Sequence, residues 1–373
     1  MIAPAPLRLL LTTDAVGGVW QYSIDLAATL AEQGVDTLLV QLGPRPSDAQ
    51  RAEAQAIDRV TLVETGLPLD WLSDGPGPVR AAGVEIGRLA RLHGADLVQC
   101  NMPTLAATAA PGVPVLAVTH GCVSTWWQHA RPGVPLDSGF TWHRALTEEG
   151  LRAADRVIAP SAEYAKVVHR QYGLPTVPSV VHNGRTPLVT PRREPVQDCV
   201  LTVGRLWDPV KGADLLDRVA GELSVPFHAA GATTGPHGET ARLHHLHLLG
   251  QLDSAALARR LAARPVFVSA ACFEPFGLAV LEAATAGCAL VLADIPVFRE
   301  LWDGVALFVP PRDPAGYYGA IERLIGDLAL RCRLGDAAAA QAGRYTPARM
   351  ADAMLSLYRQ RLAERAPAGK VAA

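Results

Sequence analysis

Residues 7–19 read LRLLLTTDAVGGV, and this stretch contains the start of a β–loop–α unit. Leu7–Thr13 is an apolar run with the length of a buried strand, and the Gly17-Gly18 turn follows it. Val19–Gln33 then repeats its apolar residues at helical spacing, and Gly34 ends that helix in the usual C-terminal position. Short apolar runs and longer helical patterns alternate in this way along the chain, which is typical of βαβ units and a parallel sheet.

The rest of the chain divides at a stretch rich in proline and charge, residues 184–195, which is typical of a linker. Before it we expect further strands at Thr37–Leu42, Val60–Val63, Asp96–Cys100, Pro114–Thr119, Arg156–Ala159 and Ser179–His182. After it we expect strands at Cys199–Val203, Phe227–Ala230, His247–Leu249, Pro265–Ser269, Ala289–Ala293 and Ala306–Val309, with helices from Asp313 onward. We therefore predict an α/β protein with two doubly wound domains, at 1–184 and 199–345, joined by a linker at 185–198. A C-terminal helix and tail at 346–373 is expected to pack back toward the first domain.

Composition excludes several classes of protein. The chain has 373 residues, 49% of them hydrophobic, and a formal net charge of −2, so it is neither disordered nor attracted to nucleic acid as a whole. No apolar run is long enough for a membrane span, and Arg8 within the first apolar stretch indicates a strand and not a signal peptide. The six cysteines are scattered without CxxC pairing, so we expect a reducing compartment, the cytoplasm. His244-His245-Leu246-His247 has no carboxylate or cysteine nearby, so we expect no metal site there.

The segment Val203-Gly204-Arg205-Leu206-Trp207-Asp208-Pro209-Val210-Lys211-Gly212 follows the first strand of the second domain. Arg205 and Lys211 flank a loop that opens a helix, so both charges can converge on a diphosphate. A solvated loop with two ordinary cations is the alternative. The chain contains only three lysines, which favours a functional interpretation of the one at position 211.

The strongest motif places two carboxylates eight positions apart, in Glu274-Pro275-Phe276-Gly277-Leu278-Ala279-Val280-Leu281-Glu282. Glu274 precedes the turn, and Glu282 lies about one turn into a helix that begins near Gly277. Both carboxylates are therefore expected to face the same crevice, with the free amides of the helix between them. The neighbours of Glu282 are apolar, so its carboxylate must be paired or functional.

Weaker signals come from the first domain. Gly17-Gly18 lies between the first strand and the first helix, where backbone amides favour anions and glycine permits close approach, although a simple turn explains it equally well. His120 ends a buried strand, and the carboxyl end of a strand favours a function, the alternative being a satisfied core or rim histidine. Trp126 and Trp127 follow it and are interpreted as an acceptor wall, the alternative being packing under a long loop.

Together these segments resemble the retaining glycosyltransferases of family 4, over nearly the whole chain and in the expected order. The resemblance rests on Glu274-x7-Glu282, Gly204-Arg205…Lys211-Gly212, Gly17-Gly18, His120 and Val181-His182-Asn183-Gly184. It implies the GT-B fold, in which two Rossmann-like domains, an acceptor side and a donor side, face each other across a cleft. The chain departs from the family after Asn183-Gly184, where Arg185-Thr186 replaces a small apolar residue and aspartate.

The resemblance also implies roles for individual residues. Glu282 is similar to the carboxylate that holds the nucleotide ribose, and Glu274 to the one that contacts the hydroxyls of the donor sugar. Arg205 and Lys211 look like the clamp on the donor diphosphate, and they replace the metal ion of other transferases. The remaining positions implied at the substrate are the Gly17-Gly18 loop over the phosphates, His120 near the transferred sugar, and Phe276, Gly277 and Leu278 near the sugar and phosphates.

The activity implied is metal-independent, retaining transfer of a hexose-type sugar from a UDP- or GDP-sugar to a small-molecule, glycan or lipid-linked acceptor, without a resident cofactor. A nucleotide-sugar epimerase, a phosphorylase and a catalytically silent nucleotide-sugar binder are the alternatives. A phosphorylase needs a pyridoxal-phosphate lysine, and Lys166 and Lys370 are poorly placed for one. Peripheral membrane contact is unsupported, because Glu85 interrupts Arg80, Arg88 and Arg91 and the helix is better explained as a solvated face.

Overall fold

The computed structural model describes residues 6–189 and 195–365, so part of the expected linker lies outside the described residues. The chain forms two compact units. The first combines Met1–Thr125 and Pro135–Gly184 with Pro347–Ala373, and the second combines Trp126–Val134 with Arg185–Thr346. The segment 126–134, which we expected in the first domain, therefore belongs to the second unit.

The first unit contains a parallel sheet of seven strands in the order β3-β2-β1-β4-β5-β6-β7. Its strands are β1 (Arg8–Asp14), β2 (Asp36–Leu42), β3 (Val60–Glu64), β4 (Leu97–Cys100), β5 (Val115–Val118), β6 (Arg156–Ala159) and β7 (Ser179–Val180). The chain starts in the middle of this sheet at β1, builds outward to β3, and then crosses to β4 on the other side of β1. The reversal of strand order between β1 and β4 is the topological switch point, where parallel α/β sheets bind their ligands.

Both faces of this sheet are covered, which explains why its strands are apolar without alternation. Leu9 and Leu11 of β1 pack with residues of α1 (Gly18–Glu32), while Leu10 packs on the opposite face with residues of α3 (Pro76–Leu92). The other helices of the first unit are α2 (Asp48–Gln55), α5 (Thr141–Ala153), α6 (Ala162–Tyr172) and the first part of α4 (Val123–Ala130).

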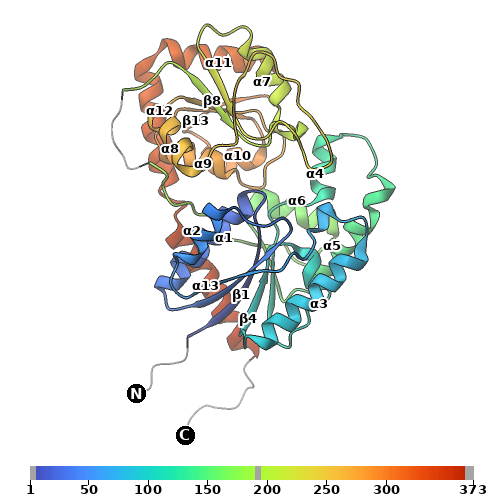
Figure 1. The fold of residues 1–373 in the computed structure, drawn as a ribbon. Helices are drawn as coiled ribbons and strands as arrows, with labels where there is room; N and C mark the ends of the chain where they lie inside the picture. Colours follow the sequence, from blue (N-terminus) through green and yellow to red (C-terminus); the bar gives the residue numbers. More distant parts are fainter. Residues whose placement is uncertain (1–5, 190–194, 366–373) are drawn as a thin grey trace. The chain divides into compact units, whose positions relative to one another are not determined.

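The last helix, α13 (Pro347–Arg365), lies beside α1 and completes the core of the first unit (Figure 1). Met350, Met354 and Tyr358 are buried in the same cluster as Trp20 and Leu9. The end of the described chain therefore stabilises the sheet that its beginning forms.

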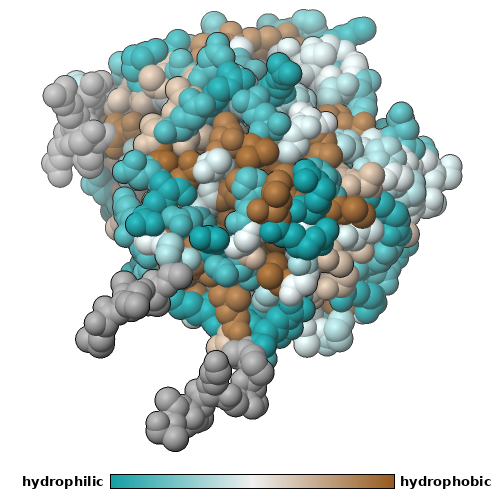
Figure 2. All heavy atoms as spheres, turned by 60° about the horizontal axis from the view of Figure 1, so that its bottom comes forward, coloured by the Kyte–Doolittle hydropathy of each residue, from teal (hydrophilic) through white to brown (hydrophobic). Residues whose placement is uncertain are grey.

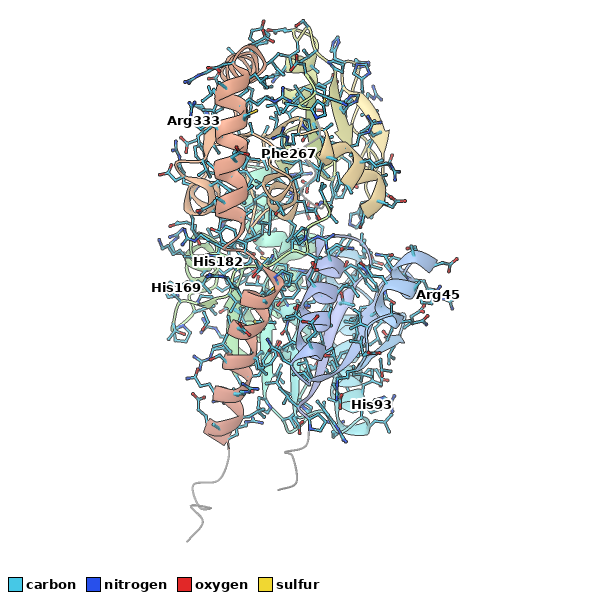
Figure 3. The ribbon with its side chains drawn as sticks, turned by 90° about the vertical axis from the view of Figure 1, so that its left-hand side faces the viewer. Arg45, His93, His169, His182, Phe267 and Arg333 are labelled. Atoms are coloured by element: carbon cyan, nitrogen blue, oxygen red, sulfur yellow. The ribbon has the colours of Figure 1, made fainter. Side chains whose placement is uncertain are left out.

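The second unit contains a parallel sheet of six strands in the order β10-β9-β8-β11-β12-β13. Its strands are β8 (Val200–Val203), β9 (Phe227–Ala230), β10 (His247–Gly250), β11 (Val266–Ser269), β12 (Leu290–Ala293) and β13 (Ala306–Val309). Its complete helices are α7 (Ala213–Ala220), α8 (Ser254–Ala262), α9 (Leu278–Thr285), α10 (Pro296–Trp302), α11 (Pro314–Gly326) and α12 (Leu328–Ala342). Phe267 of β11 lies inside this unit and Arg333 projects from α12 (Figure 3). Here the switch point lies between β8 and β11.

The two doubly wound sheets confirm the expected α/β fold, and each strand begins and ends within two residues of its expected bounds. Across the described ranges 6–189 and 195–365, no helix has the length and apolar character that a membrane span requires. On α3, Arg88 is exposed and Arg80 is half-buried, and they pair with Glu85 and Glu149, as expected of a solvated helix face. The face shown in Figure 2 is mixed, with patches of apolar side chains among hydrophilic ones.

Candidate active site

In the second unit, the loop after β8 is organised around the carboxylate of Asp208. Its Oδ2 accepts from Nε and Nη2 of Arg205 at 3.2 and 2.7 Å, and its Oδ1 accepts from the backbone N–H of Val210 at 3.2 Å. Asp208 is 1% exposed whereas Arg205 is 54% exposed. The exposed guanidinium of Arg205 thus donates two hydrogen bonds to the buried carboxylate, which fixes its orientation toward solvent.

Asp208 also binds the segment that joins this unit from the first half of the chain. The indole Nε1 of Trp126 donates to Asp208 Oδ1 at 2.9 Å, and the ring of His129 stacks on Phe273 at 4.7 Å between centroids. These contacts are the physical reason that residues 126–134 belong to the second unit.

Lys211 and Glu274 form an ion pair at the switch point of the second sheet. Lys211 ends the turn η4 (Pro209–Lys211) after β8, while Glu274 lies in the loop after the neighbouring strand β11, and the ammonium donates to Oε1 of Glu274. The two loops are joined through their backbones, because the N–H of Cys272 donates to the carbonyl of Val210 at 2.9 Å. Adjacent strands thus bring together the motifs that 63 residues separate in the chain.

Close packing behind Lys211 depends on Gly212. Its φ is +70°, and a Cβ at this position would lie 2.8 Å from the carbonyl oxygen of Ala270, beyond the end of β11. Glycine is therefore required for the chain to turn from η4 into α7 against the neighbouring strand. A small pocket opens beside the ion pair and is lined by Gly204, Lys211, Glu274, Gly277 and Val280, among others.

Glu282 lies one turn into α9, as expected, and its carboxylate is paired. Oε1 accepts from Nε of Arg185 at 2.7 Å, and the two side chains are only 11% and 6% exposed, respectively. Arg185 is the residue at which the sequence departs from the family pattern. Its guanidinium compensates the desolvation of Glu282, which explains how a carboxylate persists among apolar neighbours.

The expected site residues between Glu274 and Glu282 are Phe276, Gly277 and Leu278. Gly277 precedes α9 and Leu278 begins it, so both lie where a helix offers backbone amides. Phe276 is buried and packs edge-on against Tyr345, with ring centroids 5.7 Å apart, so its side chain is part of the core. Only the backbone of Phe276 is available for the role that the family resemblance implies.

The tryptophan pair differs from the acceptor wall that we expected. Trp127 is buried, its Nε1 donates to the carbonyl of Val134 at 3.1 Å, and the guanidinium of Arg131 lies over its ring at 4.5 Å. Trp126 is half-buried and uses its polar atom on Asp208. Both side chains hold the segment 126–134 in place, which favours the alternative that the two tryptophans pack under a loop.

In the first unit, the Gly17-Gly18 loop lies at the end of β1, at the switch point of that sheet. The carboxylate of Asp14 accepts from the N–H of Val16 at 2.9 Å and shapes the turn before α1. Both glycines are exposed, and a Cβ at Gly17 would have no neighbouring atom within 4 Å. Because the fold itself leaves room for a side chain at Gly17, packing does not explain the glycine.

His120 follows β5 and is held by two neighbours. Its Nε2 is 3.3 Å from Oδ1 of Asn101, and its ring meets that of Tyr22 edge-on at 4.4 Å between centroids. Burial lowers the pKa of His120 to about 3, so the imidazole is neutral at neutral pH. His120 can therefore accept or donate one hydrogen bond at each nitrogen but cannot act as a cation there.

Three residues in these clusters were not identified from the sequence: Asp208, Arg185 and Asn101. Asp208 lies between Arg205 and Lys211, so a carboxylate between two expected phosphate ligands was an available signal. Asn101 directly follows β4, at the same kind of position as His120 after β5. Arg185 was marked only by its departure from the family pattern, and its partner Glu282, 97 residues away, could not be predicted from the sequence. Among the described residues, no three His, Cys, Asp or Glu side chains are grouped so as to hold a metal ion.

Comparison with known proteins gives the family and the fold. One family model, described as Glycosyltransferase Family 4, matches residues 16–187, and another, described as Glycosyl transferases group 1, matches residues 197–327. The D-inositol 3-phosphate glycosyltransferase of Acidothermus cellulolyticus is 29% identical over 325 residues, which are 79% of this chain and 66% of that protein.

Solved structures share the fold at low sequence identity. Sucrose-phosphate synthase from Thermosynechococcus elongatus has a TM-score of 0.78 at 19% identity, covering 96% of this chain and all of that one. The Anabaena protein HepE in complex with UDP and glucose has a TM-score of 0.72 at 17% identity, covering 95% of this chain and all of that one. The fold and the matched models define the class, that of glycosyltransferases with the GT-B fold. Within this class, the chain belongs to glycosyltransferase family 4.

Proposed function

We propose that this protein transfers a hexose-type sugar from a nucleotide-diphosphate donor, a UDP- or GDP-sugar, to an acceptor with retention of configuration and without a metal ion. In this proposal Arg205 and Lys211 bind the diphosphate, Glu274 binds the hydroxyls of the sugar, and Glu282 binds the ribose. The Gly17-Gly18 loop approaches the phosphates, and His120 contacts the transferred sugar.

The observation that carries the proposal is the paired set at the switch point of the second sheet. Asp208 orients Arg205, and the ammonium of Lys211 donates a hydrogen bond to Glu274. An ammonium has three N–H donors, so Lys211 can contact a phosphate oxygen while Glu274 still accepts from it. Glu274 can then accept from a sugar hydroxyl beside the same phosphate. The two cations suit the negatively charged diphosphate, and the carboxylate of Glu274 suits the hydroxyls of the sugar.

The chemistry requires stabilisation of the departing phosphate. The bond between the anomeric carbon and the phosphate oxygen breaks, and negative charge grows on the nucleoside diphosphate as the sugar gains oxocarbenium character. Arg205 and Lys211 stabilise that charge. The acceptor oxygen then bonds to the anomeric carbon on the face that the phosphate leaves, and the acceptor proton passes to the phosphate oxygen, which gives retention.

The test is an assay of the purified chain with UDP-glucose, UDP-N-acetylglucosamine and GDP-mannose, with and without EDTA. The acceptor panel includes D-inositol 3-phosphate, the compound in the name of the relative from Acidothermus cellulolyticus. We expect release of UDP or GDP that depends on an acceptor and resists EDTA, with a product anomer that matches the donor by NMR. Conversion of the donor into another nucleotide sugar would instead show an epimerase, and tight binding without any consumption would show a silent binder.

A further inference from the structure

A buried chain of hydrogen bonds in the first unit ends at His120. It connects Tyr358 of α13 to Gln99 of β4, then Gln99 to Asn101, and finally Asn101 to His120. Gln99 and Asn101 are both buried. Because the backbone carbonyl of Thr12 can only accept, it fixes the orientation of the Asn101 amide, and this series of hydrogen bonds then determines which nitrogen of His120 carries the proton.

The orientation of the Asn101 amide follows from its partners. One side of the amide faces the backbone carbonyl of Thr12 at 2.8 Å, and a carbonyl can only accept. The atom on that side is therefore Nδ2, which also lies 3.1 Å from Oγ of Ser23. Consequently Oδ1 faces the other way, toward Gln99 and His120.

Gln99 is oriented in agreement with this arrangement. Its Nε2 donates to Oδ1 of Asn101 at 2.9 Å and to the hydroxyl of Tyr22 at 3.1 Å, while its Oε1 accepts from the hydroxyl of Tyr358. Burial raises the pKa of both phenols, so both keep their protons. The opposite orientation of Gln99 would place two carbonyl-type oxygens against each other.

An amide oxygen can only accept, so the nitrogen of His120 that faces Oδ1 must carry a hydrogen. That nitrogen is Nε2, at 3.3 Å. A neutral imidazole has a single N–H, which leaves Nδ1 as an acceptor. In the part of the chain that the structure describes, no hydrogen bond to Nδ1 is formed.

We propose that Asn101 is a positioning residue that holds His120 in the Nε2–H tautomer, so that Nδ1 accepts a hydrogen bond from a hydroxyl of the substrate. The inference rests on the proposed function for the identity of that substrate, a sugar nucleotide. It goes further by assigning the direction of the hydrogen bond: the group that His120 contacts must be a proton donor. A phosphate oxygen or an ether oxygen does not meet that requirement, whereas a sugar hydroxyl does.

The protonation state is tested in the full chain without substrate, by NMR of protein labelled with ¹⁵N-histidine. The signals of His120 are assigned from their loss in His120→Gln. We expect a protonated Nε2 with a slowly exchanging hydrogen and an unprotonated Nδ1 at neutral pH. A protonated Nδ1 in the wild-type protein overturns the proposal.

Two variants at position 101 and one control test the role of the amide. Asn101→Ala should release the Nε2 hydrogen to rapid exchange, whereas Ser23→Ala, which removes a contact on the other side of the same amide, should preserve it. Asn101→Asp keeps the shape and replaces the amide oxygen by a carboxylate, which should raise the pKa of His120 because it favours the imidazolium. Persistence of the slowly exchanging hydrogen in folded Asn101→Ala, or an unchanged pKa in Asn101→Asp, contradicts the proposal even if the other variant fails to fold.

Donor analogues that each lack one hydroxyl test the direction of the hydrogen bond. One analogue should lose about three- to tenfold in kcat/KM with the wild-type chain, the effect of one hydrogen bond, and much less with His120→Ala. Equal losses in both proteins for every analogue would exclude the assigned contact. The NMR results do not depend on turnover, so an inactive wild-type chain would refute the proposed function without affecting the tautomer. If His120 has the other tautomer, this inference is wrong but the proposed glycosyl transfer is unaffected.

Discussion

Arg185 and Glu282 form a buried ion pair in which Nε and Oε1 are 2.7 Å apart, although 97 residues separate them in the chain. Arg185 directly follows Asn183-Gly184, and Glu282 lies in the first turns of α9. The position at which this chain departs from the family pattern is therefore bound to the carboxylate that we propose for the ribose. The pair links a change in the linker region to the proposed donor site.

Arg185→Ala should destabilise the second unit, because it leaves the carboxylate of Glu282 in a poorly solvated site without this cation. We expect a loss of about 3–5 kcal/mol in the free energy of unfolding, measured with denaturant. Lys166→Ala is the control, since Lys166 and Glu163 form an exposed pair and its loss should cost less than about 1 kcal/mol. Equal losses in the two variants would show that the buried pair has no special role in stability.

Lys211→Ala and Glu274→Ala should each lower turnover of the nucleotide sugar about a hundredfold or more, as expected for the loss of one group that stabilises the transition state. The loss should appear in kcat, measured by release of the nucleoside diphosphate at saturating donor. Circular dichroism serves to show that the variants are folded. Folded variants with nearly normal turnover would remove both residues from the proposed mechanism.

Asp208→Asn should weaken binding of UDP or GDP, because it removes the charge that orients Arg205. We expect about a tenfold increase in Kd by calorimetry, the effect of losing one charge-assisted contact. Trp126→Phe removes the indole N–H that reaches Asp208 together with part of the ring, and it should have a smaller effect of the same sign. A larger effect for Trp126→Phe than for Asp208→Asn would contradict the prediction that Trp126 affects binding through Asp208.

Gly17→Ala and Gly212→Ala form a matched pair with opposite expectations. At Gly17 a methyl group meets nothing in the protein, so stability should be unchanged while turnover falls, because the methyl group occupies space proposed for the phosphates. At Gly212 the left-handed backbone and the nearby carbonyl of Ala270 oppose any side chain, so Ala should lower the melting temperature. Normal turnover of Gly17→Ala would show that the first loop does not approach the donor.

The carboxylate of Asp217 should make the free energy of unfolding depend on pH in the acidic range. Burial alone raises the pKa of Asp217, but the backbone N–H groups of His244, Leu246 and His245 donate to its carboxylate and bring the pKa below its ordinary value. A lowered pKa in the folded state means that the stabilisation is complete above the unfolded pKa of about 3.9 and is lost as the pH falls further.

The check is the difference in unfolding free energy between the wild-type chain and Asp217→Asn. It should be about 1–2 kcal/mol at pH 7 and should shrink below about pH 4. A difference that stays constant down to pH 3 would show that the carboxylate charge is not responsible. The same three amides fix the backbone of His244, His245 and Leu246 on the carboxylate of Asp217.

The fold could be predicted from the sequence because local patterns decide it. The leucines of β1, the helical spacing after Gly18 and the proline-rich interruption near residue 184 are each visible within a few residues. Parallel strands buried on both faces also leave a strong apolar signal, so that even short strands such as β6 (Arg156–Ala159) could be found. The Glu274 and Glu282 motif was found for the same reason, since its spacing is local.

What the sequence by itself determined was thus the order of strands and helices and the candidate cations and acids at the strand ends. Only the tertiary structure decided which of these groups contact one another. The buried carboxylate of Asp208 between Arg205 and Trp126, the pairing of Arg185 with Glu282, and the chain from Tyr358 to His120 all join residues from different strands or helices. Hydrogen bonds and ion pairs depend on distances of about 3 Å, and such distances between remote residues exist only after the sheets have formed and their helices have packed.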